Sequence, residues 1–155
     1  MLGPGLHWAF PEPIERIEKI SISEIQKVSS TVGNSLTPTD EAMGRKLQPA
    51  GQLNPAADGY VVMADQNLMH ARITLGYRIT DPLAYTFNFV DASNAVLTAL
   101  NNSLVYAAAQ TTSDEALTNN TVFKERILAR MDTLISAQRL GITIEPGSQI
   151  GRAHV

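Results

Sequence analysis

The sequence offers few residues that could carry out chemistry, and their spacing does not favour a catalytic site. Its histidines are His7, His70 and His154, and none has a second histidine at metal-ligand spacing. His70 falls on the polar side of an alternating segment, so we expect it to face solvent. No Gly-x-Ser-x-Gly turn is present, and the Gly3-Pro-Gly5 turn lacks the helix that a phosphate-binding loop needs. We therefore expect no catalytic residue, no cofactor and no metal ion.

Two adjacent carboxylates, Asp114 and Glu115, could be drawn as a general acid and base. They stand in the run Thr112-Ser-Asp-Glu, which matches a capping box, where a threonine and a glutamate three residues later satisfy the first N–H groups of a helix. Acidic residues in a first helical turn also interact favourably with the helix dipole. We interpret this pair as the start of a short helix through Leu117.

Composition excludes several function classes. The chain has 155 residues, a formal net charge of −3, 17% charged residues and no block of like charge, whereas a general nucleic-acid binder needs a basic stripe. It has no cysteine, so disulfides, thiolate metal sites and a cysteine nucleophile are excluded. No apolar run approaches the roughly 18 residues of a membrane-spanning helix. The length suits one domain with a real core.

The most regular pattern is the alternation of residues 69–79, which predicts a long strand with one buried and one solvated face. The turn residues Asp65-Gln-Asn67 precede it and fold a short strand, residues 60–63, back onto it as a hairpin. Pro82 ends it, because proline cannot donate a hydrogen bond to a neighbouring strand. The apolar positions are Met69, Ala71, Ile73, Leu75, Tyr77 and Ile79.

A period near 3.6 residues predicts two main helices further on. The first begins after a capping Ser93 and runs over residues 94–110. The second covers residues 120–139, with Gly141 as its left-handed C-terminal cap. Residues 83–90 form a short irregular or helical link, and residues 142–145 a returning strand. The buried faces are expected to hold Val96, Leu97, Leu100, Leu104 and Ala108 in the first helix and Phe123, Ile127, Met131, Leu134 and Ile135 in the second.

Residues 14–28 are expected to form two strands, and residues 30–58 a long loop rich in proline, glycine and polar residues. Strands, two main helices, a short helix and a returning strand make an α+β fold on an antiparallel core. We expect a single domain over residues 1–149. Residues 150–155, Ile-Gly-Arg-Ala-His-Val, resemble a translated sequencing adapter. We expect a non-native tail there, and the alternative is a genuine tail.

The turn and the long strand, taken with the residues after them, resemble the SPFH (band 7) domain of stomatins, prohibitins, flotillins and the bacterial HflK and HflC proteins. The resemblance covers residues 3–150 apart from the loop, and it lies closest to the HflK branch. A Pro-Gly-Leu-x-Trp start ending at Trp8 and the run Leu140-Gly-Ile142 at the other end are the outer landmarks. The central positions are Asp65, Asn67, Tyr77, Arg78, Thr80, Asp81, Pro82 and Tyr85.

The resemblance implies a non-enzymatic, membrane-associated scaffold that oligomerises through side-by-side packing of such domains. For the HflK branch it implies HflC-like subunits as partners, the membrane AAA protease FtsH as the protein that the assembly modulates, and the bacterial inner membrane as location. An apolar anchor would precede the Pro-Gly-Leu start, so we interpret Met1 as an internal start. Two departures from the family pattern are the length of the loop and the pair Asn101-Asn102, where many members carry a basic residue.

The segment Leu6 to Phe10 is the candidate membrane interface. Aromatic rings beside turn residues suit the headgroup level of a bilayer, so Trp8 and Phe10, with Leu6, are the candidate residues. From the residues alone, the aromatic pair could equally be ordinary core side chains.

Two other functions stay open. One is a stomatin- or prohibitin-like organiser of membrane microdomains that has no protease partner. The other, from a different class, is a soluble α+β domain that binds a small ligand or has an unrecognised active site.

Overall fold

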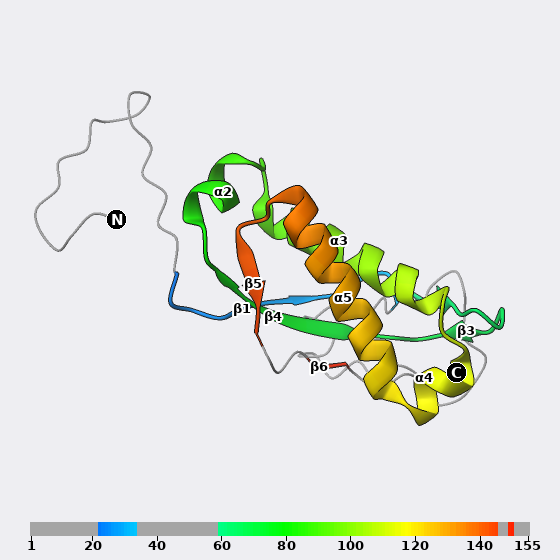
Figure 1. Cartoon of the computed structure of the whole chain (residues 1–155). Helices are drawn as coiled ribbons and strands as arrows, with labels where there is room; N and C mark the ends of the chain where they lie inside the picture. The colour runs from blue at the N-terminus through cyan, green and yellow to red at the C-terminus, as the bar shows by residue number, and fades with distance from the viewer. Residues whose placement is uncertain (1–21, 34–58, 146–148, 151–155) are drawn as a thin grey trace, which may run out of the picture.

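The computed structural model describes residues 22–33, 59–145 and 149–150 (Figure 1). The candidate interface residues Leu6, Trp8 and Phe10 lie outside the described residues. So do the first strand expected within residues 14–28, most of the predicted loop and, except for Ile150, the predicted tail.

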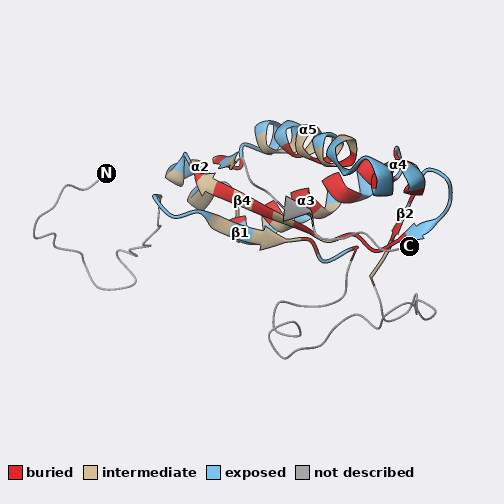
Figure 2. Cartoon of the chain, turned by 90° about the horizontal axis from the view of Figure 1, so that it is seen from below, coloured by how far each residue is buried: buried red, intermediate tan, exposed pale blue. Residues whose placement is uncertain are grey.

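The fold is α+β, as predicted, with helices packed on one face of a small antiparallel sheet (Figures 1 and 2). Helices α3 and α5 lie against each other over that sheet, and a separate two-stranded hairpin lies at one end of the domain. The elements are β1 (Gln26–Ser29), β2 (Val61–Val62), β3 (Leu68–Met69), β4 (Ile73–Ile79), α2 (Pro82–Phe87), α3 (Ala92–Ala108), α4 (Ser113–Thr118), α5 (Asn120–Gln138), β5 (Ile142–Ile144) and β6 (Gln149–Ile150).

Strand β4 is the centre of the main sheet. It pairs antiparallel with β1 on one side and with β5 and β6 on the other, with Tyr77 opposite both Gln26 and Ile144. Its side chains alternate between buried and half-buried along its whole length. The six apolar positions predicted to face the core are all at most 4% exposed, which confirms the alternation. These side chains meet the buried faces of α3 and α5 in one core.

The predicted long strand is divided in two, and the prediction that His70 faces solvent is wrong. Strand β3 pairs with β2, whereas β4 pairs within the main sheet, so the backbone changes partners between Met69 and Ile73. Alternation assigns a side chain to a face only while the strand stays in one sheet. In the connecting residues His70 is 3% exposed, and neither of its ring nitrogens has a hydrogen-bond partner.

The first residues of the predicted loop are held against this connection. Ser30 N–H donates to the Ile73 carbonyl at 2.8 Å, and Ala71 N–H donates to the Gly33 carbonyl at 3.1 Å. Thr31 is tied to helix α3, because its N–H donates to Asn101 Oδ1 at 3.0 Å. Asn101 therefore fastens the segment after β1 to the helix.

The helices have the predicted faces but differ at their ends. Asp91, not Ser93, caps α3, because its extended backbone lets the carboxylate accept the Asn94 N–H at 3.0 Å. Arg139, not Gly141, is the left-handed C-terminal cap of α5, with φ 52°. Of the predicted core positions, Leu97, Leu134 and Ile135 are only half-buried, and the others are buried: Val96, Leu100, Leu104, Ala108, Phe123, Ile127 and Met131.

The hairpin of β2 and β3 is fixed to α4 by the predicted turn. The Asp65 carboxylate accepts hydrogen bonds from the N–H and hydroxyl of Ser113, and the Asn67 amide donates to both Asp65 and Ser113 at 2.9 Å. Thr112 caps α4 by accepting the Glu115 N–H, as the capping box predicted. The pKa of Asp65 is lowered to about 2, chiefly by the hydrogen bond from the Ser113 hydroxyl.

We expect Asp65→Asn to lower the free energy of unfolding at pH 7, and the difference from the original chain to shrink in acid. The folded pKa of about 2 lies below the ordinary value of 3.8, so the ionised carboxylate stabilises the fold above pH 3.8. That contribution is lost as the pH falls through 2. Urea unfolding followed by circular dichroism between pH 7 and pH 2 measures the difference.

Asp132→Asn is the matched control, because Asp132 is exposed on α5 and no described hydrogen bond involves its side chain. This control should unfold like the original chain at every pH. A deficit in Asp65→Asn that stayed constant down to pH 2 would contradict a role for the ionised carboxylate.

Candidate functional site

Six of the eight central family-like positions, from Tyr77 to Tyr85, lie where β4 passes through α2 towards α3, a part of the chain that we call the corner. Three hydroxyl groups form a chain there. The Tyr77 hydroxyl lies 3.2 Å from that of Tyr85, which lies 3.1 Å from that of Ser93. Burial, and then the hydrogen bond to Tyr85, raise the pKa of the Tyr77 phenol. Tyr77 is therefore neutral at physiological pH and joins the strand to α2 and α3 without acting as a base.

The backbone of the corner is closed by Gly141, at the start of β5. Its carbonyl accepts the N–H groups of Thr80 at 2.9 Å and Asp81 at 3.0 Å. The Asp81 carboxylate caps α2 by accepting the N–H groups of Leu83 and Ala84, both at 3.1 Å. Pro82 occupies the first turn of that helix, where no backbone donor is needed.

Arg78 completes the set on the other side of the sheet. Its Nε donates to the Glu145 carboxylate at 2.8 Å, and both side chains are partly exposed. An exposed ion pair contributes little to stability, but this one joins β4 to the residue after β5. The corner is thus held together by contacts of Tyr77, Arg78, Asp81, Pro82 and Tyr85. At the other end of the domain, Asp65 and Asn67 hold the hairpin.

The described residues contain no group of three or more histidine, cysteine or acidic side chains able to hold a metal ion. Asp114 and Glu115 lie in the first turn of α4, as predicted. The Glu115 carboxylate forms an ion pair with the Arg126 guanidinium at 3.2 Å. None of the described helices is both long enough and apolar enough to cross a bilayer.

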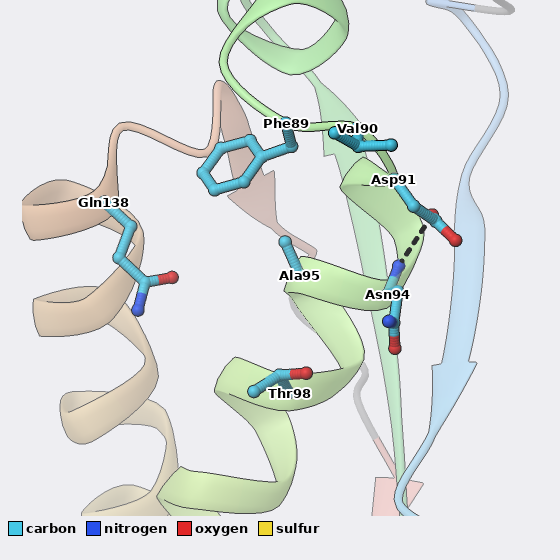
Figure 3. Close-up of a pocket in the computed structure, with 7 residues that line it drawn as sticks. All are labelled: Phe89, Val90, Asp91, Asn94, Ala95, Thr98 and Gln138. Carbon is cyan, nitrogen blue, oxygen red and sulfur yellow. Dashed lines mark hydrogen bonds between the residues drawn. The ribbon is translucent and has the colours of Figure 1, made fainter.

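An open groove of about 490 Å³ lies beside the corner, between the start of α3 and the end of α5 (Figure 3). The Phe89 ring lies between the two helices, with Ala95 and Thr98 on one side and Gln138 on the other. The Asp91 carboxylate at its rim is already engaged with Asn94. The groove therefore suits an apolar contact better than a polar ligand, which needs several converging polar groups.

The corner also exposes apolar side chains that our reading of the sequence missed. Leu83 is 70% exposed, Phe87 is 79% exposed and Val90 is fully exposed. We call these three residues the α2 patch. Leu83 and Phe87 are four residues apart and lie on one side of α2, and Val90 follows three residues after the helix ends. The four-residue spacing of Leu83 and Phe87 was the signal in the sequence. The interpretation of residues 83–90 as a connecting link did not use it.

We expect Gly141→Ala to destabilise the corner by at least about 1–2 kcal/mol, the cost of a left-handed alanine. Gly141 has φ +66°, and an added Cβ would lie 2.5 Å from the Asp81 carbonyl oxygen. Thermal unfolding measures the loss. Gly76→Ala is the control, because a Cβ there would meet the Ile25 side chain at an ordinary 3.4 Å. Equal melting temperatures for the two variants would contradict this account of the corner.

Comparisons with known proteins show the family of the chain. The model of the SPFH domain / Band 7 family matches residues 1–155. The protein HflK of Haemophilus influenzae is 18% identical to the chain over 142 residues. The matched region covers 91% of the chain but 28% of that protein, so the chain spans less than a third of this relative. The family match extends over the whole sequence, and the chain belongs to the SPFH domain / Band 7 family.

Proposed function

We propose that this domain is part of a membrane-associated oligomeric scaffold related to HflK. The observation that carries the proposal is the family match over the whole chain, in a family of membrane scaffolds. The family-like positions support it, because their contacts build the fold and do not prepare a reactive group. A scaffold needs a folded domain with exposed surface for its neighbours, and the described residues form one core with exposed apolar side chains around it.

The finer proposal is that the scaffold modulates a membrane AAA protease of the FtsH type, together with HflC-like subunits, at the bacterial inner membrane. The similarity to HflK of Haemophilus influenzae supports it. An upstream apolar helix would anchor the protein, and Leu6, Trp8 and Phe10 would lie at the lipid interface. Neighbouring domains would meet in a heterologous, head-to-tail contact, which closes into a ring when the rotation between subunits allows it.

We expect Trp8→Ser combined with Phe10→Ser to release the domain from lipid vesicles without changing its melting temperature. The two rings would together lose roughly 2–5 kcal/mol of favourable transfer if both enter the lipid. Vesicle co-sedimentation and thermal unfolding of the double variant are measured side by side. The opposite pair of results, unchanged vesicle binding and a lower melting temperature, would assign both rings to the core and contradict the interface.

The partners are tested with the membrane-anchored protein that contains this domain. We expect it to co-purify from detergent extracts with an HflC-like subunit and with the FtsH-type protease, in a complex much larger than a dimer. A large complex that contains neither the protease nor its substrates would instead favour a stomatin- or prohibitin-like organiser. A monomer at every concentration would contradict the scaffold itself.

A further inference from the structure

Helix α3 exposes a surface without charge. Residues 92–113 contain no acidic or basic side chain, although Thr98, Asn102, Val105 and Tyr106 are exposed. Val105 is 47% and Tyr106 is 44% exposed. The solvent face of an amphipathic helix normally includes charged side chains, whereas the centre of a protein–protein interface is depleted of them and enriched in tyrosine and arginine. The composition of this face is therefore closer to that of a contact surface.

One row of residues follows the line along which α3 and α5 meet. It begins at the groove, which has Thr98 on one helix and Gln138 on the other (Figure 3). Eight residues further along each helix, the Arg130 guanidinium lies 4.6 Å from the Tyr106 ring centre. The same antiparallel register places the half-buried Leu134 opposite Asn102, between these two pairs. We call this row the α3–α5 seam: Thr98, Asn102, Tyr106, Arg130, Leu134 and Gln138.

The guanidinium of Arg130 is held in place without an acceptor. Its Nε is buried and has no hydrogen-bond partner, and no ion pair joins Arg130 to another described residue. Arg126, one turn earlier on α5, instead donates to the Thr111 hydroxyl at 2.7 Å and pairs with Glu115. Stacking over the Tyr106 ring orients the Arg130 guanidinium, whose planar set of N–H donors matches a carboxylate. A carboxylate from outside the domain would satisfy it.

The seam can receive a helix better than an extended peptide. The backbones of α3 and α5 make their hydrogen bonds within each helix, so the seam offers no row of free N–H and C=O groups to an added strand. A third helix needs no such groups, and it can pack its apolar side against two others. From Thr98 to Tyr106 the seam covers eight residues, or about 12 Å. Positions seven or eight residues apart on a helix that follows the seam span the same distance.

We propose that the α3–α5 seam binds an amphipathic helix of another protein, which places an apolar side chain in the groove beside Phe89 and a carboxylate, two turns along, on Arg130. Charge complementarity favours an acidic partner, because Arg130 is the charged residue of the seam and lacks an acceptor. Contact between the seams of two copies would supply no carboxylate, because the seam contains none. The inference adds a binding surface to the proposed scaffold and does not depend on its attachment to a membrane.

A library of helical peptides displayed on phage, randomised on one face, tests the class of partner when it is selected on the 155-residue chain. We expect the selected helices to carry an aspartate or glutamate seven or eight residues from a large apolar side chain. Arg130→Gln should weaken their binding by about ten- to a hundredfold. Lys124→Gln is the matched control, because it removes the same charge from α5 outside the seam, and it should bind the peptides like the original chain.

A second pair of variants keeps the test independent of any effect of Arg130→Gln on folding. Asn102→Glu adds a carboxylate at an exposed position of the seam and should also weaken the peptides, with an unchanged melting temperature. Val62→Glu adds the same charge on the hairpin, where Val62 is 52% exposed, and should have no effect. Replacing the acid of a selected peptide by its amide should weaken binding to the original chain but not to Arg130→Gln, because the two groups form one interaction.

Selected helices that lack the acid, or that bind equally well to Arg130→Gln and Asn102→Glu, would overturn the proposal. A library that yields no binding helix would overturn it too. Sedimentation equilibrium of the chain alone tests the other occupant. Self-association that Arg130→Gln abolishes would show that a second copy covers the seam, and would also overturn the proposal. The proposed scaffold function would stand after each of these results, because none of them measures membrane association or co-purification.

Discussion

The structure depends on the burial of one face of β4. This strand has paired neighbours on both sides, and Ile73, Leu75, Tyr77 and Ile79 point from it into the core. Each such side chain contributes about 1.5–3 kcal/mol when fully buried, which is comparable with a large share of the net stability of a small domain. Helices α3 and α5 cover this face with their apolar sides. The corner at α2 lies where the chain turns from the end of β4 to place α3 over the same face.

The sequence correctly predicted the elements whose apolar residues all face a single core. The alternation in β4 and the apolar stripes of α3 and α5 depend only on a side chain facing one core, so Leu75, Val96 and Phe123 are buried as expected. The prediction for His70 failed because a change of sheet between β3 and β4 is set by pairing with a distant segment. The predicted N-cap of α3 was wrong for a local reason. Asp91 and Ser93 are both good capping residues, and the backbone angles decide which of them caps the helix.

The candidate site was harder to predict than the fold because a contact surface has no fixed combination of residue types. A catalytic site is recognised from reactive side chains at characteristic spacings, whereas a contact surface is recognised only from which side chains are exposed. The positions that resemble the family could be found from sequence, but their contacts showed that Asp81, Tyr85 and Arg78 maintain the corner. The exposed residues Leu83 and Phe87 lie between these structural positions, and their four-residue spacing indicates a shared face only once the segment is known to be helical.

The two ends of the domain differ in a way that limits how copies can assemble. One end carries the N-terminal connection and the α2 patch, and the other carries α4 and the hairpin held by Asp65. If the domains pack side by side as proposed, neighbouring copies meet through the sides of the domain and not through its ends. The outer side of α3, where Val105 and Tyr106 are half exposed and the Arg130 guanidinium lies 4.6 Å from the Tyr106 ring centre, is one of these sides, and a neighbour that covered it would exclude the proposed partner helix. Side-by-side packing would then leave both ends of the domain uncovered.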